Sequence, residues 1–147
     1  MTEMKIRLSV LSIALLAFVA MTSISKSDDE VGIIFDKMTL KQAKEKAKES
    51  GKIIFIDCYT DWCGPCRRMS ETSFKNKKVA DLYNKSFINL KVEMEKNPDG
   101  REIAKQYKIN AYPTLLMIDA DGKLVKKAVG MHKSGHLIQL ANVVLEK

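Results

Sequence analysis

The chain contains few cysteines and histidines, which limits the sites that it can form. There are three cysteines and two histidines among its 147 residues. An odd count argues against a framework of structural disulfides, which pairs its cysteines. A structural zinc site takes four ligands, and Cys58, His132 and His136 lack a ligand-like spacing to the one C-x-x-C pair, Cys63 and Cys66. Redox chemistry at that pair is therefore favoured and no metal is predicted, with a metal-bound pair as the alternative.

The N-terminal region has no apolar run long enough for an ordinary membrane span. Its apolar stretch covers residues 8–20, short of the roughly 20 residues that a spanning helix needs. Lys5 and Arg7 precede this stretch, and the small residues Ser23 and Ser25 follow it. This order is typical of a secretory signal peptide. We predict a cleaved signal in residues 1–25 and one folded domain in residues 26–147, with an uncleaved membrane anchor as the alternative.

The chain lacks a concentrated basic tract, although its formal net charge is +7. The lysines and arginines are spread over residues 41–52, 75–78, 105–108 and 123–133, and nothing concentrates them into one tract with interleaved aromatic residues. Nucleic acid is therefore not an expected partner. A solvated basic surface is the simpler interpretation, and it favours acidic partners. No internal repeat, low-complexity tract or second domain is visible.

Alternating apolar runs and helix signals predict an α/β domain. The expected strands are residues 31–35, 52–59, 87–93, 114–118 and 123–129. The expected helices are residues 39–49, begun by a Thr39 cap, 65–74, 77–84, 101–108 and 134–146, begun by a Ser134 cap. Parallel crossovers at the start and an antiparallel hairpin at the end predict a central mixed β-sheet with helices on both faces.

The C-x-x-C pair lies where a buried strand meets a helix. Residues 53–56 are β-branched or aromatic, and Pro65 suits the first turn of the following helix. A helix N-terminus stabilises a thiolate, so Cys63 is predicted to be the exposed attacking sulfur. Cys66, one turn into the helix, is predicted to be the shielded resolving thiol. With two residues between them, the pair can cycle between dithiol and disulfide.

Asp57 stands within the strand that otherwise has the composition of a protein core. A buried carboxylate needs a partner or a chemical role. Burial raises the pKa of a carboxyl toward neutrality, where a general acid or base works best. The alternative is a carboxylate at the strand edge, facing water. Cys58 is most simply a small buried apolar residue, with a regulatory thiol as the alternative.

The segment Trp62-Cys63-Gly64-Pro65-Cys66 is, residue for residue, the active-site motif of the thioredoxin family. The chain resembles that family over residues 31–147. The resemblance implies a thioredoxin fold and a thiol–disulfide oxidoreductase, with no cofactor other than the redox-active Cys63–Cys66 disulfide. Gly64 and Pro65 between the cysteines resemble the reducing members. A protein disulfide reductase is therefore expected; the alternatives are an oxidase, a disulfide isomerase, or a non-catalytic module that binds a partner or a metal.

The resemblance also implies roles for residues outside the motif. Asp57 matches the family's buried aspartate, which is implicated in proton transfer to the resolving cysteine, and Lys91 matches a lysine that neighbours it. Pro113 resembles the family's cis-proline, which lies against the redox cysteines. Tyr112 would then line the substrate groove, and Trp62 would present a contact surface for partners.

Residues 69–84 look closer to exported thioredoxin-like proteins and to the thioredoxin-like end domain of membrane electron carriers than to a cytosolic thioredoxin. Together with the predicted signal, this implies an exported, periplasmic or otherwise extracytoplasmic protein. The expected partners are disulfide-bearing protein substrates and an upstream electron donor such as a membrane thiol reductase. A monomer is expected, in contact with a membrane only if the N-terminal segment stays uncleaved.

Overall fold

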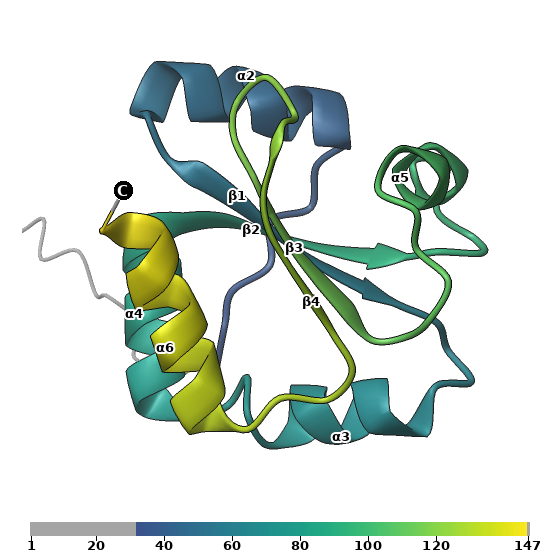
Figure 1. Ribbon diagram of the computed structural model, residues 1–147, viewed down its shortest axis with the longest axis vertical. Coiled ribbons are helices and arrows are strands. Elements are labelled where there is room, and N and C mark those ends of the chain that lie inside the picture. Colours follow the sequence, from purple (N-terminus) through teal and green to yellow (C-terminus); the bar gives the residue numbers. More distant parts are fainter. Residues whose placement is uncertain (1–31, 147) are drawn as a thin grey trace, which may run out of the picture.

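A four-stranded mixed sheet forms the centre of the computed structural model, which describes residues 32–146 (Figure 1). The predicted signal peptide, residues 1–25, lies outside the described residues. The strand order is β2-β1-β3-β4, with β1 (Ile53–Tyr59), β2 (Phe87–Glu93), β3 (Thr114–Ile118) and β4 (Leu124–Val129). β1 and β2 are parallel, whereas β3 runs antiparallel to both β1 and β4. The predicted combination of a parallel crossover and a terminal hairpin is confirmed.

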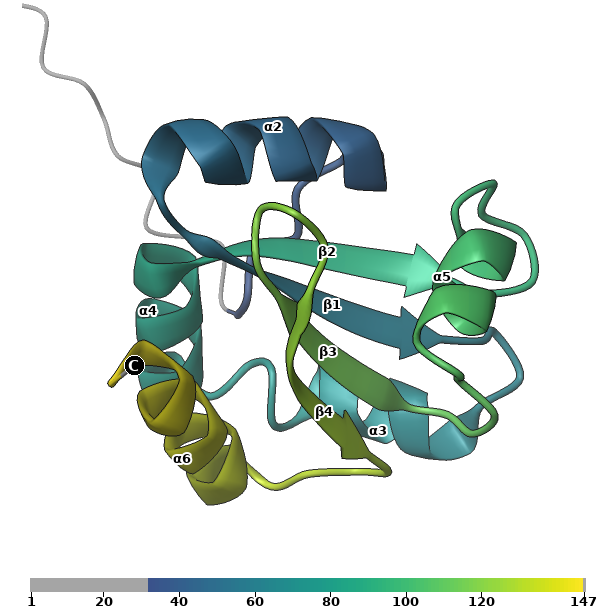
Figure 2. The same cartoon turned by 45° about the horizontal axis from the view of Figure 1, so that its top comes forward.

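Helices cover both faces of the sheet, as predicted (Figure 2). One face carries α2 (Leu40–Ser50) and α5 (Gly100–Gln106). The other carries α3 (Gly64–Glu71), α4 (Lys77–Ser86) and α6 (Ser134–Leu145). None of the helices within residues 32–146 combines the length and hydropathy needed to cross a membrane.

The alternation of β1 side chains divides the apolar interior into two clusters. Ile54, Ile56 and Cys58 pack with α2 and α5 in one cluster. Phe55 packs in the other, together with residues of β2, β3 and the three helices of the opposite face and with Ile33 and Phe74. β1 is therefore buried on both sides and pairs with a strand at each edge, so its carboxyl end is held firmly. That end leads through residues 60–62 into α3.

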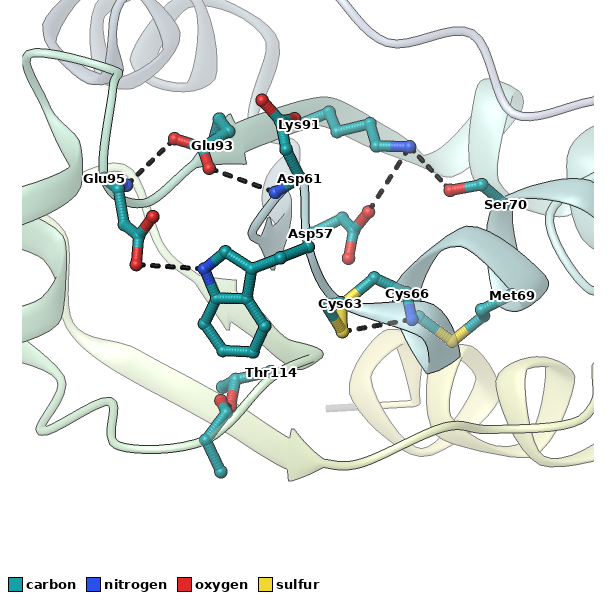
Figure 3. Close-up of a disulfide and its surroundings, with 12 residues drawn as sticks. Asp57, Asp61, Cys63, Cys66, Met69, Ser70, Lys91, Glu93, Glu95 and Thr114 are labelled. Carbon is teal, nitrogen blue, oxygen red and sulfur yellow. Dashed lines mark hydrogen bonds and ion pairs between the residues drawn. A yellow bond between two sulfur atoms is a disulfide. The ribbon is translucent and has the colours of Figure 1, made fainter.

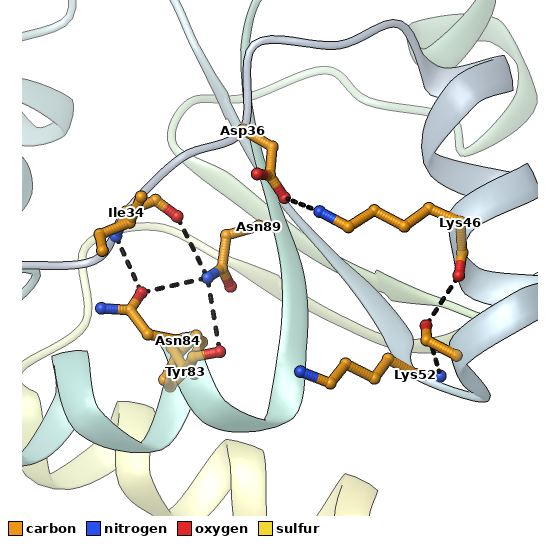
Figure 4. A network of polar contacts seen from close by, with 8 residues as sticks. Ile34, Asp36, Lys46, Lys52, Tyr83, Asn84 and Asn89 are labelled. Carbon is orange, nitrogen blue, oxygen red and sulfur yellow. Dashed lines mark hydrogen bonds and ion pairs between the residues drawn. The ribbon is translucent and has the colours of Figure 1, made fainter. Parts of the chain in front are cut away.

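The strand predicted for residues 31–35 is wrong for the part that is described, because residues 32–35 contain no strand. Amide side chains take the place of strand pairing (Figure 4). Ile34 donates its N–H to Asn84 Oδ1 at 2.8 Å, and Asn89 Nδ2 donates to the Ile34 carbonyl at 3.3 Å. The Asp36 N–H reaches the Asn89 carbonyl of β2 at 2.8 Å. The segment is thus anchored beside β2 by individual bonds.

Helix signals were informative at α2 and less so at α6. Thr39 caps α2 in a reciprocal capping box with Gln42, and Gly51 ends the helix with a φ of 68°, as the turn chemistry of such ends requires. The cap predicted at Ser134 is one residue late, because the N-cap of α6 is Lys133 and forms no side-chain cap bond. Leu145, the last residue of α6, is 44% exposed.

Candidate active site

Cys63 and Cys66 form a disulfide at the first turn of α3, with an S–S distance of 2.08 Å and 5.3 Å between their Cα atoms. Cys63 is the N-cap of the helix, with extended backbone angles (φ −78°, ψ 104°), and Pro65 follows in the first turn. The backbone N–H of Cys66 donates to Cys63 Sγ at 3.2 Å. The N–H of Cys66 at the helix start therefore points at the sulfur on which a thiolate would form, as the position of the motif predicts.

The predicted difference in exposure between the two cysteines is small. Cys63 is 4% exposed and Cys66 is 2% exposed, so the expectation of an openly exposed Cys63 is wrong for this disulfide form. The reason lies in the local geometry. The Cys63 side chain turns back onto its own helix, where it is bonded to Cys66 Sγ and accepts the Cys66 N–H.

Asp57 is fully buried on β1, as predicted from its apolar neighbours. Neither carboxyl oxygen accepts a hydrogen bond from the described residues. Burial raises the pKa of this carboxyl to about 7, while the positive charge of Lys91 acts in the opposite direction. Figure 3 shows the carboxyl on the side of β1 that faces the disulfide. The group can therefore gain and lose a proton near neutral pH inside the protein.

Lys91 lies directly opposite Asp57 in the parallel pairing of β1 and β2. Its Nζ is 3.8 Å from Asp57 Oδ2 and only 2.6 Å from Ser70 Oγ. The side chain is 28% exposed. The predicted neighbourhood of Lys91 and Asp57 is confirmed, whereas the contact with Ser70 was not foreseen.

Trp62 is 66% exposed beside the disulfide and is held by two contacts. Its indole Nε1 donates to Glu95 Oε1 at 3.1 Å, and its ring meets the Tyr112 ring edge-on at 6.0 Å between centroids. Glu93 supports the same loop: its carboxylate accepts backbone N–H groups from Asp61, Glu95 and Lys96. Sequence reasoning missed both glutamates. The only signal was their placement at the end of a strand neighbouring β1, where side chains and loops converge.

Pro113 follows a cis peptide bond from Tyr112 and is buried. The cis isomer expected from the resemblance is thus confirmed. The Pro113 carbonyl accepts the N–H of Gly130 at 2.8 Å, which connects the loop before β3 to the end of β4. Gly64, in contrast, has open space where a Cβ would lie, so packing does not require a glycine there.

We assign no catalytic role to the third cysteine or to the two histidines. Cys58 is a free, fully buried thiol, and burial raises its pKa far above the usual range. His132 is partly buried, and burial together with His136 lowers its pKa. The two imidazole rings meet edge-on at 4.4 Å between centroids. Among residues 32–146, no three side chains of the histidine, cysteine, aspartate and glutamate types gather as metal ligands would.

Known proteins of the same kind match most of the folded part of the chain. Residues 40–144 match a family model described as a thioredoxin-like domain. The chain is 38% identical over 91 residues to a thioredoxin H-type of Oryza sativa subsp. indica, covering 60% of this chain and 66% of that protein. It is 34% identical over 84 residues to the thiol:disulfide interchange protein DsbD of Pseudomonas fluorescens, covering 56% of this chain and 14% of DsbD. The chain thus spans just under two thirds of the rice protein and a small part of DsbD.

A solved structure is similar over nearly its whole length. It is the solution structure of a putative disulphide-isomerase from Bacteroides thetaiotaomicron, which is 40% identical to this chain with a TM-score of 0.69. The match covers 79% of this chain and 95% of that one. The thioredoxin fold expected from the Trp62–Cys66 motif is confirmed.

Proposed function

Because the chain belongs to the thioredoxin-like family of thiol–disulfide oxidoreductases, we propose that it reduces disulfides of protein substrates outside the cytoplasm. The observation that supports this most directly is the Cys63–Cys66 disulfide at the N-terminus of α3, on the same side of β1 as the buried Asp57. This arrangement supplies an activated sulfur, a second sulfur within bonding distance and a proton carrier of neutral pKa.

The reaction has two exchange steps. The Cys63 thiolate attacks one sulfur of the substrate disulfide, forms a mixed disulfide and releases the other substrate sulfur as a thiolate. Cys66 then passes its proton to Asp57 and attacks Cys63 Sγ, which closes the Cys63–Cys66 bond and releases the second substrate thiolate. Two electrons pass from the protein to the substrate. The disulfide form described above is the product of this half-cycle, and a dithiol donor must return two electrons for the next one.

Activity measurements on single variants test the proposal. Cys63→Ser should abolish reduction of insulin by the dithiothreitol-reduced protein. Cys66→Ala should accumulate mixed disulfides with the substrate, because no second sulfur resolves them. Cys58→Ala is the matched control and should keep wild-type activity, since that thiol is buried on the other face of the sheet. Retained activity in Cys63→Ser would rule the proposal out.

A disulfide isomerase is the second candidate, because the similar Bacteroides structure carries that description. The reduction potential of the Cys63–Cys66 couple distinguishes the two functions. The reduction potential is about −270 mV for thioredoxin and about −180 mV for protein disulfide isomerase. We expect a value close to the first, measured by equilibration with glutathione and with a thioredoxin of known potential.

The extracytoplasmic setting rests on the composition of residues 1–25 and on the partial match to DsbD. The same match supports a membrane thiol reductase as the upstream electron donor. Two observations test this. The mature protein from the native cell should begin near residue 26 by mass spectrometry, and the Cys66→Ala variant expressed there should be trapped on exported proteins. A full-length chain in the cytoplasm would contradict the setting.

A further inference from the structure

The ammonium group of Lys91 has a well-defined place beside the buried carboxyl of Asp57. Its shortest polar contact is to Ser70 Oγ, at 2.6 Å. It also lies over two aromatic rings, 4.8 Å from the centroid of Tyr59 and 5.6 Å from that of Phe35. A cation in such a position is attracted to both ring faces. Ser70, Tyr59 and Phe35, which come from different parts of the chain, therefore all contact the Lys91 ammonium group.

The carboxyl itself is not among the hydrogen-bond partners of this ammonium. Asp57 Oδ2 is 3.8 Å from Lys91 Nζ, beyond hydrogen-bond reach. Figure 3 shows Nζ between Ser70 and Asp57, with its short contact to the serine. The cation thus attracts the carboxylate across a gap without the close pairing that usually accompanies a buried aspartate and a lysine.

Ser70 is placed for this contact by the helix that carries the redox cysteines. It lies four residues after Cys66 on α3, so the two side chains project from the same side of the helix one turn apart. The anchor of the ammonium and the resolving sulfur are therefore parts of one rigid element.

We propose that Ser70 is a positioning residue, whose hydroxyl holds the Lys91 ammonium away from Asp57 and so limits the attraction between this cation and the buried carboxyl. This inference rests on the proposed function, in which Asp57 takes the proton of Cys66. Without the hydroxyl, the strongest remaining attraction for the ammonium is the buried carboxylate, because a charge in low-dielectric surroundings acts more strongly than one in water. The ammonium should then close the gap and stabilise the ionised carboxyl.

The surroundings of Asp57 leave Lys91 as the charge that can transmit such a change. On β2, Lys91 faces it; on β3, its partner in register is the apolar Leu115. α3 contributes the Cys63–Cys66 disulfide and Ser70, neither of which is charged. On β1 itself, the neighbours Cys58 and Tyr59 have raised pKa values and are neutral at pH 7. Burial raises the pKa of Asp57, and Lys91 is the one charge within the described residues that acts on this pKa, which it lowers.

Lys91 also borders a hollow at the protein surface, and its ammonium group can move toward solvent there instead of toward Asp57. A hollow of about 550 Å³ is lined by Lys91 together with Phe35, Met38, Gln42, Asn97 and Asp99, among others. If the serine only kept the ammonium from leaving toward this hollow, its removal would weaken the cation's influence on the carboxyl. The two roles therefore predict opposite changes in the pKa of Asp57.

The test is a carbon-13 NMR titration of the Asp57 carboxyl in the full chain, in the disulfide form. Ser70→Ala should lower its pKa from about 7 by about one pH unit, the size expected when an opposite charge moves into contact. Ser70→Thr, which keeps a hydroxyl, should restore the wild-type titration. Lys91→Met should raise the pKa, and Ser70→Ala added to Lys91→Met should have no further effect.

Thr72→Ala is the matched control, because it removes a hydroxyl at the end of α3 whose one hydrogen bond within residues 32–146 goes to the Arg68 carbonyl. It should leave the titration unchanged. An unchanged or raised pKa in Ser70→Ala, or a shift that persists in the Lys91→Met background, would overturn the proposal. The titration involves no turnover, so its failure is distinct from failure of the Cys63→Ser activity test. Where both proposals hold, the pH profile of insulin reduction should move with the Asp57 pKa.

Discussion

Asp57 and Cys58 are consecutive residues of β1, and their side chains are buried on opposite faces of the sheet. Burial raises the pKa of both groups. The consequences differ because the ordinary pKa of a carboxyl is much lower than that of a thiol. The carboxyl of Asp57 reaches about 7 and becomes a group that titrates under physiological conditions. The thiol of Cys58 is moved beyond the range in which it ionises, so it behaves as an apolar side chain.

The first prediction concerns the pH dependence of stability. Because the pKa of Asp57 is raised from 3.8 to about 7, the folded protein keeps a proton between these values that the unfolded chain has lost. The free energy of unfolding therefore falls as pH rises through this window. Asp57→Asn removes the effect. Between pH 5 and pH 8, wild-type stability should fall by about 2–3 kcal/mol more than that of the variant.

Denaturant unfolding of the disulfide form at several pH values measures this difference. Asp81→Asn is a suitable control, because Asp81 is an exposed carboxylate on α4 paired with Lys77. It should retain the wild-type pH dependence. Parallel curves for wild type and Asp57→Asn would show that the carboxyl is not buried as described.

The second prediction concerns the free thiol. In the native disulfide form, Cys58 should not react with a thiol reagent such as dithionitrobenzoate, because it is fully buried and its pKa is raised. One thiol per chain should appear after unfolding without reductant, and Cys58→Ala should abolish that signal. Rapid reaction of the native protein would instead favour the alternative of a regulatory thiol.

The third prediction concerns the orientation of Trp62, the only tryptophan of the chain. Glu95→Ala removes the acceptor of its indole N–H. We expect lower fluorescence anisotropy, while Glu95→Gln, which keeps an amide oxygen, should resemble wild type. If Trp62 contacts partners as the resemblance implies, KM for a protein disulfide should rise about 2- to 10-fold, which corresponds to the loss of one ordinary hydrogen bond. Unchanged anisotropy in Glu95→Ala would contradict the orienting contact.

The fourth prediction concerns Glu93, which is 9% exposed and uses both carboxylate oxygens. One oxygen accepts the Asp61 N–H, and the other accepts those of Glu95 and Lys96. Glu93→Gln places an NH₂ group against a backbone donor. We expect a loss of about 1–3 kcal/mol in the free energy of unfolding, measured by denaturant titration.

An exposed glutamate on α3 provides the comparison for this change. Glu71→Gln should alter stability by less than about 0.5 kcal/mol, as surface substitutions usually do. Equal, small effects of the two substitutions would show that the Glu93 carboxylate does not support the loop.

Much of the fold could be predicted because its signals are local. The apolar runs at β1 and β3, the Thr39 cap and the Gly51 end of α2 each depend on residues adjacent in the chain. The strand expected over residues 31–35 is wrong because, although Ile33 is buried, Ile34 is exposed and its backbone bonds to the amide side chains of Asn84 and Asn89 instead of to a neighbouring strand. Asn84 and Asn89 are far away in sequence, and nothing near residue 33 indicates them.

The candidate site shows the same division. The C-x-x-C spacing was enough to predict Cys63 and Cys66 as site residues, and the apolar neighbours of Asp57 were enough to predict a buried carboxylate. Ser70 could not be predicted, because its contact with Lys91 depends on how α3 lies over β2, and no local sequence pattern determines that arrangement. The exposure of Cys63 was misjudged for a related reason, since its position at a helix start says nothing about the direction in which its side chain turns.

The anchored segment at residues 33–36 has a consequence for how the sheet meets other chains. It lies beside β2, where Asp36 bonds to the Asn89 carbonyl, and it leaves β4 as the border strand without such a neighbour among the described residues. β4 presents the exposed Lys126 along that border, and charged lysines there discourage an added strand. The β2 edge of the sheet is thus covered in part by the protein's own backbone, and the β4 edge carries a charge that disfavours pairing with a strand of another chain.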